Sequence, residues 1–91
     1  SCKQLMRRYA YLKKPIKCNS KDYIYKIMLY EDKQGVFLFE YCSPDAVHCS
    51  YDQWYTDVQS IYDDWNDEID ERGWIDINNP LPEQPDDLLE E

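Results

Sequence analysis

Acidic side chains gather in the second half of the chain at spacings that suit one side of a helix. Asp63, Asp67 and Asp70 stand at i, i+4 and i+7, with Glu71 beside them, so a helix would carry these carboxylates along one stripe. Such a stripe can bind a hard cation such as Mg²⁺ or Ca²⁺, form a solvated helix face, or meet a basic protein. A metal site takes ligands from several elements, and the predicted hairpin supplies no matching carboxylates. We therefore predict no metal or cofactor, and these four residues are our candidate partner-binding site.

Cysteine and histidine also cluster, just before that acidic segment. Cys42, His48 and Cys49, together with Cys18, could form a Cys₃His zinc site, but the chain has no Cys-x-x-Cys pair, so we expect none. Cys49 beside His48 offers a nucleophile and a base, yet neighbouring residues in a loop usually point apart. His48 is the only histidine and the chain has two glycines, which leaves no phosphate-binding loop. The sequence predicts a protein that is not an enzyme.

The charge of the chain is divided along its length. Residues 1–21 carry seven basic groups and no acid, whereas residues 43–91 carry Arg72 as their one basic group against fifteen acids, and the net charge is −9. Divided charge is typical of a docking surface, and we predict that the acidic part binds a basic protein. The alternative is a nucleic-acid-associated protein that uses residues 1–21, where Tyr9 and Tyr11 lie among the basic residues. We expect nucleic-acid binding less than protein binding, because the acidic rest of the chain repels phosphates.

The chain is predicted to fold as a single α+β domain of 91 residues, beginning with a possible helix and a hairpin. Pro15 closes a possible helix over residues 3–14, where apolar residues recur at helical spacing: Leu5, Met6, Tyr9 and Leu12. Two aromatic-rich runs, 23–30 and 36–42, flank a five-residue connection that contains Gly35. That pattern predicts a β-hairpin, but both faces of its first strand are largely apolar, so the core side stays open.

The second half of the chain predicts one long amphipathic helix and a short third strand. Ser50 and Gln53 fit a capping box before a helix over residues 52–71, and Gly73 can end it. The apolar stripe of this helix would face the hairpin and consists of Trp54, Val58, Ile61, Tyr62, Trp65 and Ile69. Residues 74–77 alternate as a strand, and the Pro-rich acidic end over residues 78–91 is expected to be extended or frayed.

The C-terminal segment also carries a resemblance. Its Trp74-Ile75-Asp76-Ile77-Asn78-Asn79-Pro80-Leu81-Pro82 run resembles that of small uncharacterised bacterial proteins, in which an aromatic hairpin and an acidic helix precede a strand that leads into Pro-Leu-Pro. The resemblance covers residues 23–87, departs at Glu83-Gln84, and implies no function.

Two further patterns bear on the compartment. There is no run of eighteen apolar residues, so no membrane span is predicted. No apolar region follows the basic N-terminus, so no secretory signal is predicted either. We therefore expect a cytoplasmic protein whose cysteines are reduced thiols, namely Cys2, Cys18, Cys42 and Cys49. Oligomeric state is left open by the sequence.

Overall fold

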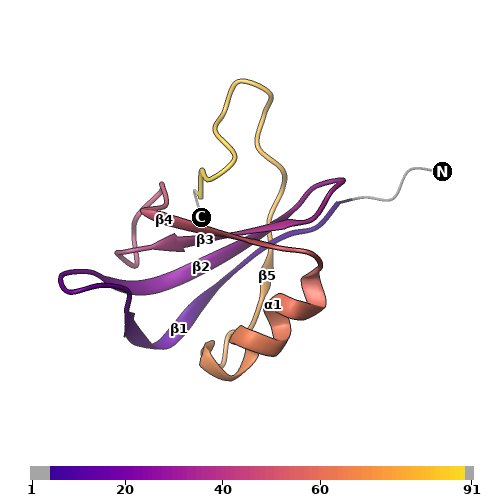
Figure 1. Ribbon diagram of the computed structural model, residues 1–91. Coiled ribbons are helices and arrows are strands. Elements are labelled where there is room, and N and C mark those ends of the chain that lie inside the picture. Colours follow the sequence, from indigo (N-terminus) through magenta and orange to yellow (C-terminus); the bar gives the residue numbers. More distant parts are fainter. Residues whose placement is uncertain (1–4, 90–91) are drawn as a thin grey trace.

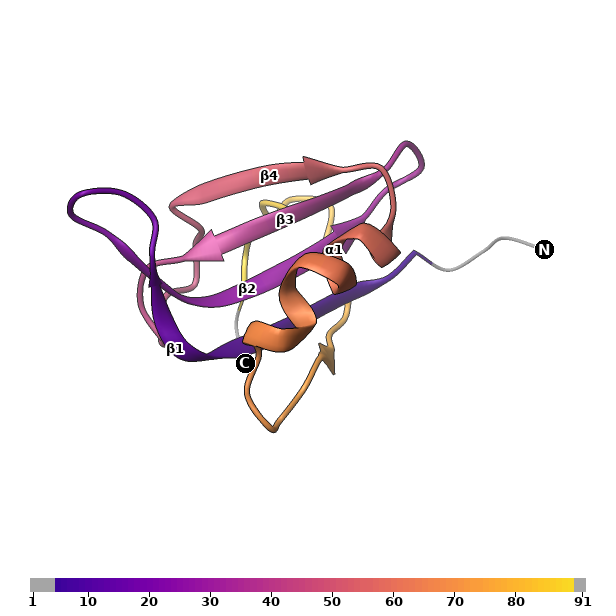
Figure 2. The same cartoon turned by 60° about the horizontal axis from the view of Figure 1, so that its bottom comes forward.

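A computed structural model describes residues 5–89 and shows a small domain built on one antiparallel sheet (Figure 1). The five strands lie in the order β4-β3-β2-β1-β5. One short helix, continued by a 3-10 turn, lies against one face of the sheet, and the C-terminal segment lies over the other (Figures 1 and 2). None of the described helices is long and apolar enough to cross a membrane. The elements are β1 (Arg7–Lys17), β2 (Tyr23–Glu31), β3 (Val36–Tyr41), β4 (Tyr51–Tyr55), α1 (Val58–Trp65), η1 (Asn66–Glu68) and β5 (Ile75–Asp76).

The predicted α+β fold is wrong in its helices, beginning with the one over residues 3–14. Residues 7–17 instead form β1, which pairs with β2 on one side and β5 on the other; residues 3 and 4 lie outside the described part. Ala10 and Leu12 belong to the core under α1, whereas Tyr9 packs on the opposite face. Because both faces are covered, apolar side chains occur at odd and even positions of this strand, and their spacing also matched a helix.

The predicted hairpin is confirmed. Strands β2 and β3 pair antiparallel from Glu31 opposite Val36 to Lys26 opposite Tyr41. The Asp32 carboxylate accepts from the backbone N–H groups of Gln34 at 2.8 Å and Gly35 at 3.0 Å, which is the local turn chemistry expected of an aspartate.

The long helix predicted over residues 52–71 is also wrong, because its first turn is strand β4. Residues 51–55 pair with β3, and α1 starts after Asp57, whose carboxylate accepts from the Ser60 N–H at 2.8 Å. Ser50 and Gln53 form no capping box; Gln53 donates to Glu40 instead. Tyrosine and tryptophan favour strands, and each of the five residues of β4 pairs with a residue of β3. The predicted third strand over residues 74–77 is present as the two-residue β5.

Two apolar layers hold the sheet, one on each face. Under α1, Ile61 is fully buried against Ile27, Leu29 and Leu38, with Val58, Tyr62, Trp65 and Ile69 of the predicted stripe around it. The sixth member of that stripe, Trp54, lies on β4 and is 47% exposed. On the opposite face, Leu89 of the C-terminal segment is buried against the following residues: Met28, Phe39 and Tyr41. The double burial explains why the alternation in β2 did not identify a single core face.

Candidate functional site

The four acids singled out by the sequence do not share one helical stripe. Asp63 lies on α1, where Gln59 donates to it at 3.0 Å, and Asp67 lies in η1. The chain leaves the helix at Ile69, which is extended and forms a bridge to Leu12. Asp63 and Asp67 are exposed, as is Glu71 in the turn that follows. The helical spacing that would have aligned all of them therefore ends before Asp70.

Asp70 differs from the others because it is engaged within the fold. Its carboxylate accepts from Arg72 Nε at 2.9 Å and from an Arg72 terminal nitrogen at 2.6 Å, and its side chain is only 12% exposed. Hydrogen bonding to this guanidinium lowers the pKa of Asp70. The guanidinium itself lies 3.8 Å from the centre of the Tyr11 ring. Asp70 therefore positions Arg72 on the sheet and presents little charge to solvent.

Two acids that were not part of the predicted site, Asp64 and Glu68, line a hollow of about 320 Å³ together with Ile16 and Trp65. The Trp65 indole N–H donates to the Tyr55 hydroxyl at 3.1 Å, and that hydroxyl donates to Asp64 Oδ2 at 3.1 Å. Both contacts fix the wall of the hollow to β4. The spacing of Asp64 and Glu68, four residues apart and next to Trp65, can be read from the sequence. The proximity of Ile16, which comes from β1, cannot.

The surface around this hollow is strongly negative. Asp63, Asp64, Asp67, Glu68 and Glu71 are all exposed, and residues 43–71 contain no lysine or arginine. In the part of the chain that the structure describes, no basic side chain forms an ion pair with any of these five. We call this set, with Ile16 and Trp65, the acidic surface. Because their negative charge is not neutralised by such an ion pair, these carboxylates can interact with a cationic partner.

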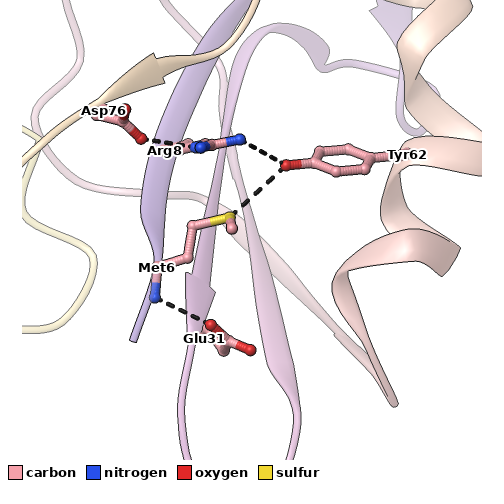
Figure 3. A network of polar contacts seen from close by, with 5 residues as sticks. All are labelled: Met6, Arg8, Glu31, Tyr62 and Asp76. Carbon is pink, nitrogen blue, oxygen red and sulfur yellow. Dashed lines mark hydrogen bonds and ion pairs between the residues drawn. The ribbon is translucent and has the colours of Figure 1, made fainter. Parts of the chain in front are cut away.

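The basic N-terminal segment is divided by the fold. Arg8 bonds to Asp76 at 2.6 Å and to the Tyr62 hydroxyl at 2.8 Å, and so joins β1 to β5 and to α1 (Figure 3). The Tyr62 hydroxyl also contacts Met6 Sδ at 3.6 Å. Arg7 is buried, whereas Lys13, Lys14, Lys17 and Lys21 are exposed towards the far end of β1 and the turn after it. The two arginines of this segment thus have internal partners, and its lysines supply the exposed positive charge.

Two members of the cysteine and histidine cluster, Cys49 and His48, contact Asp87. Asp87 Oδ2 accepts from the Cys49 N–H at 2.9 Å and lies 3.5 Å from His48 Nδ1. Burial and the neighbouring carboxylate raise the pKa of the Cys49 thiol to about 12, so at neutral pH it is neither an activated nucleophile nor a ready metal ligand. Among residues 5–89 no group of three His, Cys, Asp or Glu side chains is arranged to hold a metal. Cys18 and Cys42 are free thiols, and Cys2 lies outside the described residues.

The C-terminal segment is docked, contrary to the expectation that it would be extended or frayed. Arg7, on β1, donates to the carbonyl oxygens of Asn78 and Leu88, and the Tyr41 hydroxyl donates to the Asp87 carbonyl at 2.6 Å. The Leu89 N–H donates to Val47 O at 2.8 Å. As predicted from the prolines, residues 78–89 form no helix or strand. We call them the C-terminal loop; they serve to cover the second face of the sheet.

Compared with protein-family profiles, with curated proteins and with solved structures, the chain gives no significant match. The resemblance to small bacterial proteins therefore stays a prediction, and function has to be argued from the surface itself.

Proposed function

We propose that this protein is a non-enzymatic binding module whose acidic surface docks a basic protein partner. The observation that carries the proposal is the hollow between β1 and the end of the helical segment. Asp64 and Glu68 supply two carboxylates, while Ile16 and Trp65 supply apolar walls. A lysine or arginine side chain has the matching chemistry, because its aliphatic stem packs on apolar surface and its charged end pairs with carboxylates.

The charge around the hollow supports the same partner. Asp63, Asp67 and Glu71 extend the negative field beyond the two acids of the hollow, and the whole chain carries a net charge of −9. Fields of this kind accelerate the encounter with an oppositely charged protein. Replacing Asp63→Asn, Asp67→Asn and Glu71→Gln together is expected to slow association more than it speeds dissociation, and added salt should have the same effect. Stopped-flow association rates at several salt concentrations measure this.

A paired set of charge variants tests the proposal. In the test variant, Asp64→Asn and Glu68→Gln remove the two carboxylates of the hollow. The control variant, Asp45→Asn with Glu83→Gln, removes two exposed acids elsewhere, so its net charge equals that of the test variant. Each form is immobilised and incubated with native lysate, and retained proteins are identified by mass spectrometry. The wild type and the control variant should retain the same basic protein and the test variant should lose it. Equal retention by all three forms would refute the hollow as the docking site.

The free thiols support a cytoplasmic location as part of this proposal. Cys18 is exposed and unpaired, and Cys42 and Cys49 are also free. Unpaired thiols are typical of a reducing compartment. Cell fractionation with thiol trapping tests this, because an exported protein would be found with oxidised cysteines outside the cytoplasm.

The alternative is a nucleic-acid-associated protein, and one observation favours it. The four lysines are exposed, namely Lys13, Lys14, Lys17 and Lys21, and Lys17 pairs with Tyr23, which is itself 44% exposed. Lysines next to an accessible ring suit single-stranded nucleic acid. Binding of a poly-uridine oligonucleotide, lost when the four lysines are changed to glutamine, would move this function to first place. For the basic-protein reading, the same four changes should leave partner binding unchanged or strengthened, since they remove opposing charge.

A further inference from the structure

Strand β4 forms an edge of the sheet. Its five residues, Tyr51–Tyr55, pair with β3 on one side, and across residues 5–89 no strand pairs with the other side (Figure 2). Alternate N–H and C=O groups along such an edge face outward without a sheet partner. Many proteins protect exposed edges with lysine, proline or a bulge, yet β4 contains no lysine or proline and pairs in continuous register. The edge is therefore open to an added strand.

An aromatic side chain on this edge, Trp54, is held in place by its neighbours. Trp54 is 47% exposed, but its ring is held against Phe37, with the two ring centres 4.8 Å apart in an edge-on arrangement. Beneath it, a Cβ built on Gly35 would lie 2.3 Å from the indole, so only glycine allows this close approach. An indole that is fixed yet half exposed loses little side-chain freedom on binding, which is typical of an interface anchor.

The charged residues of β4 and of the segment that follows it up to Glu71 are all acidic. Asp52 lies two residues before Trp54 and so shares its face of the strand, and it is exposed. On the other face, Tyr55 donates to Asp64 of the acidic surface, and Asp57 follows the strand as the helix cap. A second copy of this chain would bring another net charge of −9 to this edge, whereas an extended basic segment would complement it.

We infer that a lysine- or arginine-bearing segment of the basic partner binds in extended form along β4, adding a strand to the sheet. The inference rests on the proposed function and specifies its mode of recognition. Main-chain hydrogen bonds to the free edge supply affinity, and a cationic side chain above the Trp54 ring, close to Asp52, supplies specificity. Tyr55 of β4 bonds to both Asp64 and Trp65, so this strand also contacts the wall of the hollow that is proposed to receive another basic side chain of the partner.

Two peptides test the inference on the full chain. The probe is acetyl-Lys-Val-Lys-Val-Lys-Val-Lys-amide, and the control is the same peptide N-methylated at every internal backbone amide. The control keeps all side chains and charge but lacks the donors that pair with an edge strand. Binding is followed at low salt by NMR, through amide exchange in residues 51–55 and the Trp54 indole signal. With the probe, exchange in β4 should slow by about tenfold or more, and the control should bind about tenfold more weakly or worse.

Each contrary result is decisive. Equal binding of the two peptides would overturn strand addition while leaving charge-driven docking, and so the proposed function, intact. Failure of the probe to bind, or protection confined to α1, would also overturn the inference. A free protein that sediments as a dimer with β4 amides already protected would assign the edge to a second copy. The variant Trp54→Thr, which keeps a good strand former on this edge, should weaken probe binding several-fold without altering the other strand signals.

Discussion

The attachment of the C-terminal loop depends on one buried guanidinium, so the change Arg7→Met gives a demanding test of the fold. Arg7 is 6% exposed and donates to the carbonyls of Asn78 and Leu88, the two ends of the loop. Methionine keeps an unbranched stem of similar reach but supplies no donor. The expected result is a loop that detaches from the sheet and a lower free energy of unfolding.

The magnitude follows from what Arg7 gains and loses in the fold. Hydrogen bonds from a charged donor are worth about 1.5–3 kcal/mol each, and two of them are lost. Against this, the buried Nε has no partner in the described chain, and burial lowers the pKa of the guanidinium, so part of the gain is offset by desolvation. We expect a net loss of about 2–4 kcal/mol, which a domain of this length, stable by roughly 5–14 kcal/mol, survives.

Urea denaturation measures the loss, and amide exchange locates it. The amides of Leu89 and Cys49, which bond to Val47 and Asp87, should exchange much faster in the variant than in the wild type. Arg8→Met is the matched control: it removes an exposed ion pair to Asp76 and a hydrogen bond to the Tyr62 hydroxyl, so it should cost about 1–2 kcal/mol and leave the exchange of Leu89 slow. If Arg7→Met unfolds at the wild-type urea concentration with slow Leu89 exchange, the guanidinium does not hold the loop and the reasoning fails.

Three further predictions concern the helix, a thiol and an ion pair. Trp65→Ala should lower the free energy of unfolding by about 2–4 kcal/mol, because a half-buried ring leaves the core, whereas Trp54→Ala should cost under about 1 kcal/mol; similar urea midpoints would contradict the placement of the two rings. Cys49, with its pKa raised to about 12, should react with iodoacetamide at pH 8 far more slowly than exposed Cys18, and equal rates measured by mass spectrometry would show that Cys49 is accessible. Since Arg72 lowers the pKa of Asp70, their pairing stabilises the fold above about pH 4 and is lost as pH falls through the lowered pKa; Asp70→Asn should therefore flatten the acid side of the stability curve, and an unchanged curve would argue against the pair.

Local chemistry in the sequence was enough to predict some of the structure. The hairpin followed from two aromatic runs around a turn in which Asp32 and Gly35 supply the needed geometry, and these interactions span only a few residues. The burial of Val58, Ile61 and Trp65 followed from their spacing, since one side of any helix in this segment must face the core. The excess of acid near the helix was visible as composition alone.

Only the tertiary structure decides whether residues 7–17 and 51–55 form strands or helices. A strand shows alternating apolar and polar residues only when one of its faces is exposed to solvent. In β1 the C-terminal loop covers the second face through Leu89 and Arg7, so this alternation is missing from the sequence. For β4, pairing with β3 outweighed the helical spacing of Trp54 with Val58 and Ile61, because a neighbouring strand satisfies backbone groups that local sequence does not identify.

The candidate site shows the same division. Asp63, Asp67 and Glu71 were identified from the sequence, and the structure leaves their carboxylates exposed, but Asp70 turned inward to Arg72, which stacks on Tyr11 of β1. The hollow needs Ile16 beside Trp65 and Glu68, and the open edge of β4 exists only because the sheet ends there. Local spacing determines which residues can share one face of an element, whereas contacts between residues far apart in the chain depend on how the elements pack, and this site is made of such contacts.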